Sequence, residues 1–341
     1  MTTTTGIRPT MTAAVYRHFG EPDVVRLEQL AVPTPGPGTV LIRVHASTVS
    51  VADHRARSRD IPAGLGLLAA SGLGVFRPSR RVLGMDVAGV VEAVGAGVTA
   101  FTPGDRVIAM MGGAFGGHAE YVCLPQDGAI ARAPESMSFE EAVTLVFGGV
   151  TAHGFFSKVT IRPGTTVLVN GASGAVGTAA IQLAKQLGAH VTAVTSGANA
   201  ELVTSLGADR VIDYTKVDFA TSGDSYDVIV ECVGNAPFEK VDAAINPGGA
   251  LLLVISDLIG MLRSRAQSRK SGKLVTSNVG KPAAEDLAYL VSLADSGHFR
   301  AVIDRSYDLA DVVEAHRYVD TGRKRGNVVL RVVAAPPAAR P

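Results

Sequence analysis

The hydrophobic and polar positions follow two different rhythms along the chain. Residues 11–130 consist of short β-branched stretches separated by turn clusters, such as "TVLIRVHAST" preceded by "PTPGPGT". From residue 165, apolar strands alternate with helical segments, as in "TTVLVN" followed by the helix pattern of 175–188. Strands that alternate with helices indicate a parallel, doubly wound sheet, whereas the first rhythm is typical of a mainly β domain.

These rhythms predict how the chain is divided. We expect a mainly β part at residues 11–130 and a doubly wound α/β part from residue 165. The last segment, "YDLADVVEAHRYVDTGRKRGNVVLRV", predicts one helix and one strand, and that strand should rejoin the first domain. The fold class is therefore α/β.

Composition narrows the possible partners. The chain has 341 residues, 47% hydrophobic and 18% charged, with a net charge of +1, so no overall field attracts nucleic acid or an acidic membrane. The two cysteines, Cys123 and Cys232, lie far apart in the sequence and belong to no paired motif. This favours a reducing compartment and argues against a disulfide scaffold.

The chain ends and the most apolar segment argue against a membrane protein. "MTTTTGIRPT" lacks the apolar core of a signal peptide, and like "AAPPAARP" it is expected to be a solvated tail. The apolar stretch 61–76 is too short and too rich in glycine to span a bilayer. We therefore expect a cytoplasmic protein with neither a membrane nor a nucleic-acid partner.

The stretch "VNGASGAVG" at 169–177 lies between a predicted strand and a predicted helix, the context that a dinucleotide-binding fingerprint requires. Gly174 would let the backbone approach a pyrophosphate, and Gly177 would allow close packing of helix on strand. The helix N-terminus would attract the phosphates. The first fingerprint position holds Ala172 rather than glycine, so a tight turn without a ligand is the alternative.

The end of the second strand predicts which cofactor binds. NAD sites usually place Asp or Glu there, about 20 residues past the fingerprint. The stretch Thr195–Asn199 contains no acid, and Ser196 and Asn199 could instead hydrogen-bond a 2′-phosphate, with Arg323 or Arg325 approaching in the fold. We therefore expect NADPH rather than NADH, although these two side chains could simply mark a helix N-terminus. The expected cofactor-binding residues are Gly171, Ala172, Ser173, Gly174, Ala175, Val176, Gly177, Ser196, Asn199, Tyr214, Val233 and Ile255.

Four stretches resemble the medium-chain dehydrogenase/reductase superfamily, and its zinc-free, quinone-reductase-like branch fits best. They are "LGMDVAGVVEAVGAGVTAFTPGDRV", "VLVNGASGAVGTAAIQLAKQLGA", "SLGADRVIDY" and "AVIDRSYDLADVVEAHRYVDTGRKRGNVVLRV". The resemblance, from about Thr12 to Val333, implies a GroES-like catalytic β domain with its first part at 11–135 and its C-terminal part at 282–334. A Rossmann domain would be inserted at 136–281, with the active site in the cleft between the two domains. It also implies hydride transfer from a nicotinamide to quinones or α,β-unsaturated carbonyls, and a homodimer that pairs Rossmann edge strands, here "ALLLVIS".

The positions that bind zinc in related enzymes hold other residues in this chain. Ser50 stands where zinc relatives have a cysteine, Met85 where they have the histidine of a "GHE" triplet, and Phe147-Gly148 near their third ligand. Serine, methionine and phenylalanine do not form the nitrogen, sulfur or oxygen ligand set of zinc. The resemblance therefore implies no metal.

Few residues of the sequence are candidates for a direct role in catalysis. A hydride added to an enone or quinone leaves an oxyanion, which hydrogen-bond donors would stabilise. Thr151, in "GGVTA", resembles the family segment beside the nicotinamide, and Ser50 stands at the vacated zinc position. His118 could deliver a proton. Each has a structural alternative: a helix-capping hydroxyl, a buried satisfied serine and a structural histidine.

Neighbouring charged residues have mainly structural interpretations. Asp53 is expected to cap a helix or to pair with Arg55 or Arg57, and His54 and His153 are expected to be structural or exposed.

The segment 61–76 bears on the substrate. An apolar lid there would favour a small hydrophobic substrate, and a short helix packed into the core is equally compatible. The sequence thus predicts a zinc-independent NADPH-dependent reductase of quinones or α,β-unsaturated carbonyls. The alternatives are a zinc-free alcohol dehydrogenase, a dedicated biosynthetic reductase, and a non-catalytic NADP-binding regulatory protein.

Overall fold

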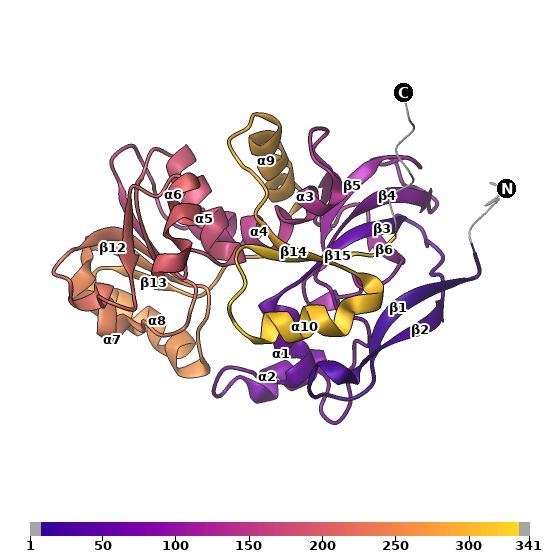
Figure 1. The fold of residues 1–341 in the computed structure, drawn as a ribbon, viewed down its shortest axis with the longest axis horizontal. Helices are drawn as coiled ribbons and strands as arrows, with labels where there is room; N and C mark the ends of the chain where they lie inside the picture. Colours follow the sequence, from indigo (N-terminus) through magenta and orange to yellow (C-terminus); the bar gives the residue numbers. More distant parts are fainter. Residues whose placement is uncertain (1–7, 334–341) are drawn as a thin grey trace.

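The computed structural model describes residues 8–333, which form two sheet-based halves (Figure 1). The solvated tails expected at the ends fall largely on residues 1–7 and 334–341, outside this described part. Between residues 8 and 333, every helix is too short or too polar to cross a bilayer.

The first half contains a seven-stranded sheet with the order β14-β15-β3-β4-β5-β7, in which β6 also pairs with β3. Its C-terminal strand β15 runs antiparallel to β3, with Val328 opposite Val49, so that strand rejoins the N-terminal half as the sequence pattern predicts. A separate ribbon pairs β1 with β2. The strands are β1 (Thr10–Tyr16), β2 (Val25–Ala31), β3 (Thr39–Val49), β4 (Asp86–Val94), β5 (Arg106–Met110), β6 (Tyr121–Pro125), β7 (Ile130–Arg132), β14 (Ile303–Asp308) and β15 (Asn327–Arg331).

The second half contains a six-stranded, wholly parallel sheet with the order β10-β9-β8-β11-β12-β13. This doubly wound order confirms the predicted Rossmann architecture. One detail of the prediction is wrong: "ALLLVIS" falls in β12, which is an interior strand because the three-residue β13 pairs outside it. The strands are β8 (Thr166–Asn170), β9 (His190–Thr195), β10 (Arg210–Asp213), β11 (Tyr226–Glu231), β12 (Ile245–Leu253) and β13 (Leu274–Thr276).

Helices cover both faces of the parallel sheet, so successive residues of its strands are buried on opposite sides. Val167 and Val169 of β8 pack in one hydrophobic cluster with α4, α5 and α9, whereas Leu168 packs in the cluster on the other face. The first cluster also contains Ala46 and Ile108 of the β half, so the two halves share a core. The helices are α1 (Val51–Ser58), α2 (Gly66–Leu73), α3 (Phe139–Val143), α4 (Val146–Phe156), α5 (Ala175–Gln186), α6 (Ala200–Ser205), α7 (Phe238–Val241), α8 (Leu258–Ser271), α9 (Ala284–Asp295) and α10 (Val312–Asp320).

The apolar segment 61–76 contains the short helix α2 followed by an exposed turn. Leu73 packs against the core of the β half, but Val75 and Phe76 are 53% and 91% exposed. The side chains of residues 67–69 lie outside the described part. The alternative of a fully packed core helix is therefore wrong for the end of this segment.

Candidate active-site cleft

A cleft of about 1210 Å³ is lined by residues from both halves of the molecule. On the Rossmann side, its lining follows the carboxyl ends of β8, β9, β11 and β12, which is where doubly wound sheets bind ligands. On the β side, the lining comes from α1, the end of α2, Phe115, and Val319 and Gly322 to Arg325 at and after the end of α10, while Phe147 of α4 lines the cleft where the two halves meet. The cleft therefore joins a nucleotide-type site to a second, mainly apolar compartment.

The glycine loop gives the cleft its phosphate-binding geometry. Gly171 has φ +79°, a left-handed conformation that favours glycine, whereas Gly174 has φ −80° and is the N-cap of α5. A Cβ on Gly177 would lie 2.3 Å from the Gly171 carbonyl oxygen, so this glycine permits the close helix–strand packing that the fingerprint implies. Within residues 8–333, no side chain caps α5, so the first N–H groups of this helix can bind phosphate oxygens.

Hydroxyl and amide groups gather at the end of β9. Asn199 Nδ2 donates to the hydroxyl oxygens of Ser173, Thr195 and Ser196 at 3.2–3.3 Å. Tyr214, 61% exposed, lines the same part of the cleft. The nearby carboxylate of Asp213 accepts hydrogen bonds from the N–H and hydroxyl of Thr215 and does not line the cleft. This end can therefore bind a ribose and a phosphate through neutral donors.

The charge of the cleft is strongly positive. Its lining contains one acidic side chain, Asp218, and five basic ones: Arg55, Lys240, Arg323, Lys324 and Arg325. Lys324 Nζ donates to the Gly326 carbonyl oxygen at 2.7 Å, and burial lowers the pKa of Lys324 to about 8. Such a lining favours an anionic ligand.

The cleft contains most of the predicted cofactor-binding residues. Eleven of the twelve line it; Ala172 is fully buried and lies under Gly177 instead. Arg323 and Arg325 also line it, whereas the sequence did not single out Arg55 as a site residue and gave no signal for Lys240 or Lys324. These basic residues reach the cleft from α1, α7 and the segment after α10, so only the tertiary structure brings them together.

The structure places none of the three predicted catalytic residues in the lining of the cleft. Thr151 Oγ1 donates to the Phe147 carbonyl oxygen at 2.7 Å within α4. His118 is fully buried, and its Nε2 lies 3.0 Å from the carbonyl oxygen of Thr48. Ser50 is buried and caps α1, with its Oγ 2.6 Å from Asp53 Oδ2. A direct role in catalysis stays a prediction for all three.

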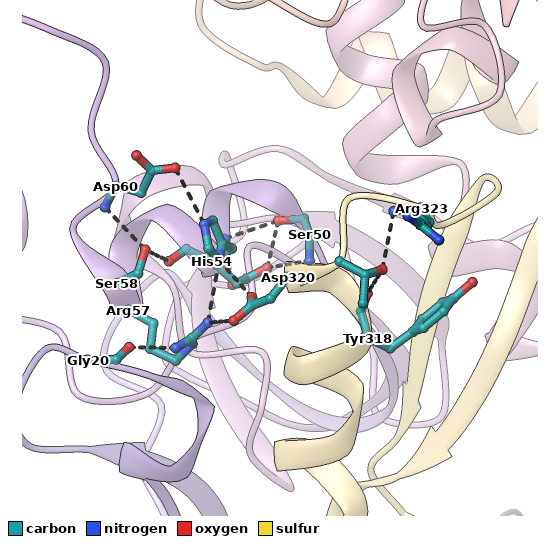
Figure 2. Close-up of polar contacts among 11 residues, drawn as sticks. Gly20, Ser50, His54, Arg57, Ser58, Asp60, Tyr318, Asp320 and Arg323 are labelled. Carbon is teal, nitrogen blue, oxygen red and sulfur yellow. Dashed lines mark hydrogen bonds and ion pairs between the residues drawn. The ribbon is translucent and has the colours of Figure 1, made fainter. Parts of the chain in front are cut away.

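A polar network fixes α1 against α10 next to the cleft (Figure 2). Asp53 completes the capping box of α1, which is the first of its two expected structural roles, whereas Arg57 pairs with Asp320. His54 Nδ1 also lies 2.6 Å from Asp320 Oδ1. The side chain of Arg57 is wholly buried, so Asp320 neutralises a cation that water cannot reach.

Two further carboxyl groups are buried outside the lining of the cleft. Asp86 accepts hydrogen bonds from the N–H and hydroxyl of Thr48 at 2.8 and 2.7 Å, and burial raises its pKa to about 7. Glu231, at the end of β11, accepts from the N–H groups of Val233 and Gly234, and burial raises its pKa as well. Among residues 8–333, no three His, Cys, Asp or Glu side chains are arranged to hold a metal ion.

Comparisons with known proteins agree with this architecture. The family model of the alcohol dehydrogenase GroES-like domain matches residues 36–135, and that of the zinc-binding dehydrogenase matches residues 206–330. The chain is 33% identical to 2-methylene-furan-3-one reductase of Solanum lycopersicum, over 97% of this chain and 81% of the relative. It is 32% identical to a chloroplastic quinone oxidoreductase of Triphysaria versicolor, over 89% of this chain and 92% of the relative.

A solved structure, the quinone oxidoreductase from Coxiella burnetii, superposes with a TM-score of 0.85 at 29% identity, over 95% of this chain and 100% of the other. The fold and the cleft thus define a medium-chain dehydrogenase/reductase, and the chain belongs to that superfamily. Within the superfamily it belongs to the quinone oxidoreductase-like branch, and it is an NAD(P)H-dependent oxidoreductase.

Proposed function

We propose that the protein is an NADPH-dependent reductase that transfers hydride to a quinone or an α,β-unsaturated carbonyl without using zinc. The observation that carries this proposal is the cleft, in which an uncapped helix N-terminus and five basic side chains adjoin an apolar compartment. The relatives named as a 2-methylene-furan-3-one reductase and quinone oxidoreductases support the same substrate classes.

The residues present fit a nicotinamide dinucleotide. The first N–H groups of α5 would hold its pyrophosphate, while Ser196 and Asn199 would bind the adenosine ribose. The absence of acid at Thr195–Asn199 and the basic lining support a 2′-phosphate, hence NADPH. When bound, the cofactor would supply the hydride, and this chain would orient the substrate and exclude water.

Zinc independence rests on the residues at the three vacated positions. Ser50 is engaged with Asp53, Met85 packs against the core of the β half, and Phe147 offers no ligand atom. A conjugated carbonyl is already polarised, so its reduction needs less help from a Lewis acid than the oxidation of an alcohol does.

We also propose a homodimer in the cytoplasm. The support for the dimer is β13, which ends the parallel sheet and leaves Leu274 at its exposed edge, since an unpaired edge favours pairing with a second chain. The support for the compartment is that Cys123 and Cys232 are both free thiols. The domain boundaries after residues 135 and 281 are part of this proposal.

Steady-state assays with a panel of quinones, enones and alcohols test the function. We expect NADPH-dependent reduction of quinones or enones that is unchanged after dialysis against a chelator, with NADPH binding tighter than NADH. Oxidation of alcohols alone would favour an alcohol dehydrogenase. NADPH binding without turnover of any substrate would favour a regulatory protein.

A further inference from the structure

Arg55 is the charged residue in the apolar compartment of the cleft. α1, the end of α2 and Phe115 contribute six residues to the lining, which we call the β wall, and five of them are apolar. The β wall consists of Val51, Ala52, Arg55, Ala56, Leu73 and Phe115. A substrate held against it meets hydrocarbon nearly everywhere and a guanidinium at one point.

The surroundings of Arg55 differ sharply from those of Arg57, two residues further along α1. Arg57 is wholly buried and paired with Asp320, whereas the Arg55 guanidinium makes no hydrogen bond or ion pair with any group in residues 8–333. Asp60 is the carboxylate whose charge acts on Arg55, but Asp60 is 76% exposed and its Oδ2 lies 3.5 Å from His54 Nε2. Burial lowers the pKa of Arg55, and the group stays charged.

A half-buried cation without a partner has lost part of its hydration free energy, and nothing in the protein compensates for it. An anion that enters the cleft can therefore compensate for this loss by pairing with the cation. The guanidinium also presents a planar fork of donors that matches two oxygens of a carboxylate. The cofactor phosphates have the glycine loop and the segment after α10 for partners. Arg55 belongs to α1, outside both of these segments, and is therefore left for the substrate.

We propose that Arg55 binds an anionic oxygen of the substrate and thereby selects quinones or enones with an apolar body and a negatively charged oxygen. The inference rests on the proposed function. Two oxygens meet the description: a carboxylate present before the reaction, and the carbonyl oxygen during it. In the second case, hydride adds to carbon, the C=C electron pair shifts, and the negative charge ends on the carbonyl oxygen, which a proton from water then neutralises.

Matched substrates and variants of the full chain test this inference. The substrates are 1,4-naphthoquinone and a 1,4-naphthoquinone that carries a carboxylate side chain, each with saturating NADPH. The variants are Arg55→Gln, Arg55→Lys, and as a control for net charge Arg26→Gln, because Arg26 is exposed on β2 and does not line the cleft. NADPH dissociation constants and thermal unfolding are measured for every protein.

Loss of a charge-assisted hydrogen bond should lower kcat/KM by about 10- to 100-fold. If the carboxylate is the partner, Arg55→Gln should lower kcat/KM by this factor only for the carboxylate substrate, mainly because KM rises. If the carbonyl oxygen is the partner, Arg55→Gln should lower kcat for both substrates. Arg55→Lys should recover part of either loss, because it keeps the charge without the fork.

Two results would overturn the inference. One is unchanged kinetics of Arg55→Gln on both substrates. The other is a loss fully explained by weaker NADPH binding, which would assign Arg55 to the cofactor. Both require that the wild-type protein reduces 1,4-naphthoquinone, whereas a wild-type protein that reduces neither quinone nor enone contradicts the proposed function itself.

Discussion

The backbone N–H of Gly326 donates to the carbonyl oxygen of Ser173 at 2.7 Å, and this bond ties the segment after α10 to the glycine loop. The contact continues as a parallel bridge between Gly326 and Gly174. It brings Arg323, Lys324 and Arg325 beside the loop expected to hold the pyrophosphate. Two parts of the expected phosphate site that are about 150 residues apart in the sequence are thereby held together.

Gly326→Ala should weaken NADPH binding. Gly326 has φ +65°, and a Cβ would lie 2.4 Å from the Val302 carbonyl oxygen, so the segment must shift and its hydrogen bond to the glycine loop is disturbed. We expect the NADPH dissociation constant to rise at least about tenfold, the equivalent of one lost hydrogen bond. Gly272→Ala is the matched control, because Gly272 has a similar φ of +71°, has open space around it and does not line the cleft. Equal affinities of the two variants would contradict the role assigned to the contact.

Ser196→Asp should move the cofactor preference toward NADH. A carboxylate at this position repels a 2′-phosphate and can accept hydrogen bonds from the ribose hydroxyls. We expect the ratio of the NADH to the NADPH dissociation constant to fall by about tenfold or more. Ser196→Asn, which adds similar volume without charge, separates repulsion from crowding. A preference unmoved by the carboxylate would show that the phosphate is bound elsewhere.

The sequence predicts best those features that a short segment determines alone. The glycine loop is one, because strand, turn and helix follow one another and the cofactor meets the backbone. The basic lining is different: Arg55, Lys240 and Lys324 lie in unrelated segments, and each resembles an ordinary surface residue until the fold brings it to the cleft. The edge strand was missed for a related reason, since the three residues of β13 carry no recognisable alternation.

Backbone geometry was also only partly predictable. The sequence indicates that several glycines are needed near residue 174, but the left-handed conformation occurs at Gly171. The position of His118 illustrates a similar limit. Its side chain suits proton delivery, yet the structure buries it beside His316, with ring centroids 5.9 Å apart, because both lie on inward faces of the β half.

Asp320→Asn should destabilise the protein. Asp320 neutralises the wholly buried Arg57 and contacts His54 (Figure 2), so its removal leaves a buried cation without a counter-charge. We expect the free energy of unfolding to fall by about 3 kcal/mol. Asp60→Asn removes an exposed partner of the same histidine and should cost less than about 1 kcal/mol. Denaturant titration measures both, and similar losses would show that Arg57 does not depend on Asp320.

Asp86→Asn should change how stability depends on pH. Burial raises the pKa of Asp86 from 3.8 to about 7, so the folded state binds this proton more tightly than the unfolded state does. This carboxyl group therefore lowers the free energy of unfolding as pH rises from about 4 to about 7, by up to about 4 kcal/mol. Asparagine cannot ionise and keeps this stability.

The measurement for Asp86 is the difference in unfolding free energy between the variant and the wild type at each pH. His45 and His316, whose pKa values are lowered by burial, act in the opposite direction in both proteins, so only the difference isolates Asp86. We expect the unfolding free energy of the variant to increase relative to that of the wild type as the pH rises. A constant difference from pH 4 to 7 would contradict the raised pKa.

Gly174→Val and Gly177→Ala should have opposite consequences. Gly174 has φ −80°, which valine tolerates, and its Cβ would meet no protein atom closer than the Gly171 carbonyl oxygen at 3.6 Å. The added side chain therefore occupies the space where a pyrophosphate would approach, so we expect near-normal thermal unfolding and NADPH binding weakened by about 100-fold or more. In Gly177→Ala, the Cβ would lie 2.3 Å from that oxygen and 2.7 Å from Ala172 Cα, so folding itself should suffer. Near-normal NADPH affinity in a folded Gly174→Val protein would mean that "VNGASGAVG" is only a turn, and the proposed hydride transfer would lose its structural basis.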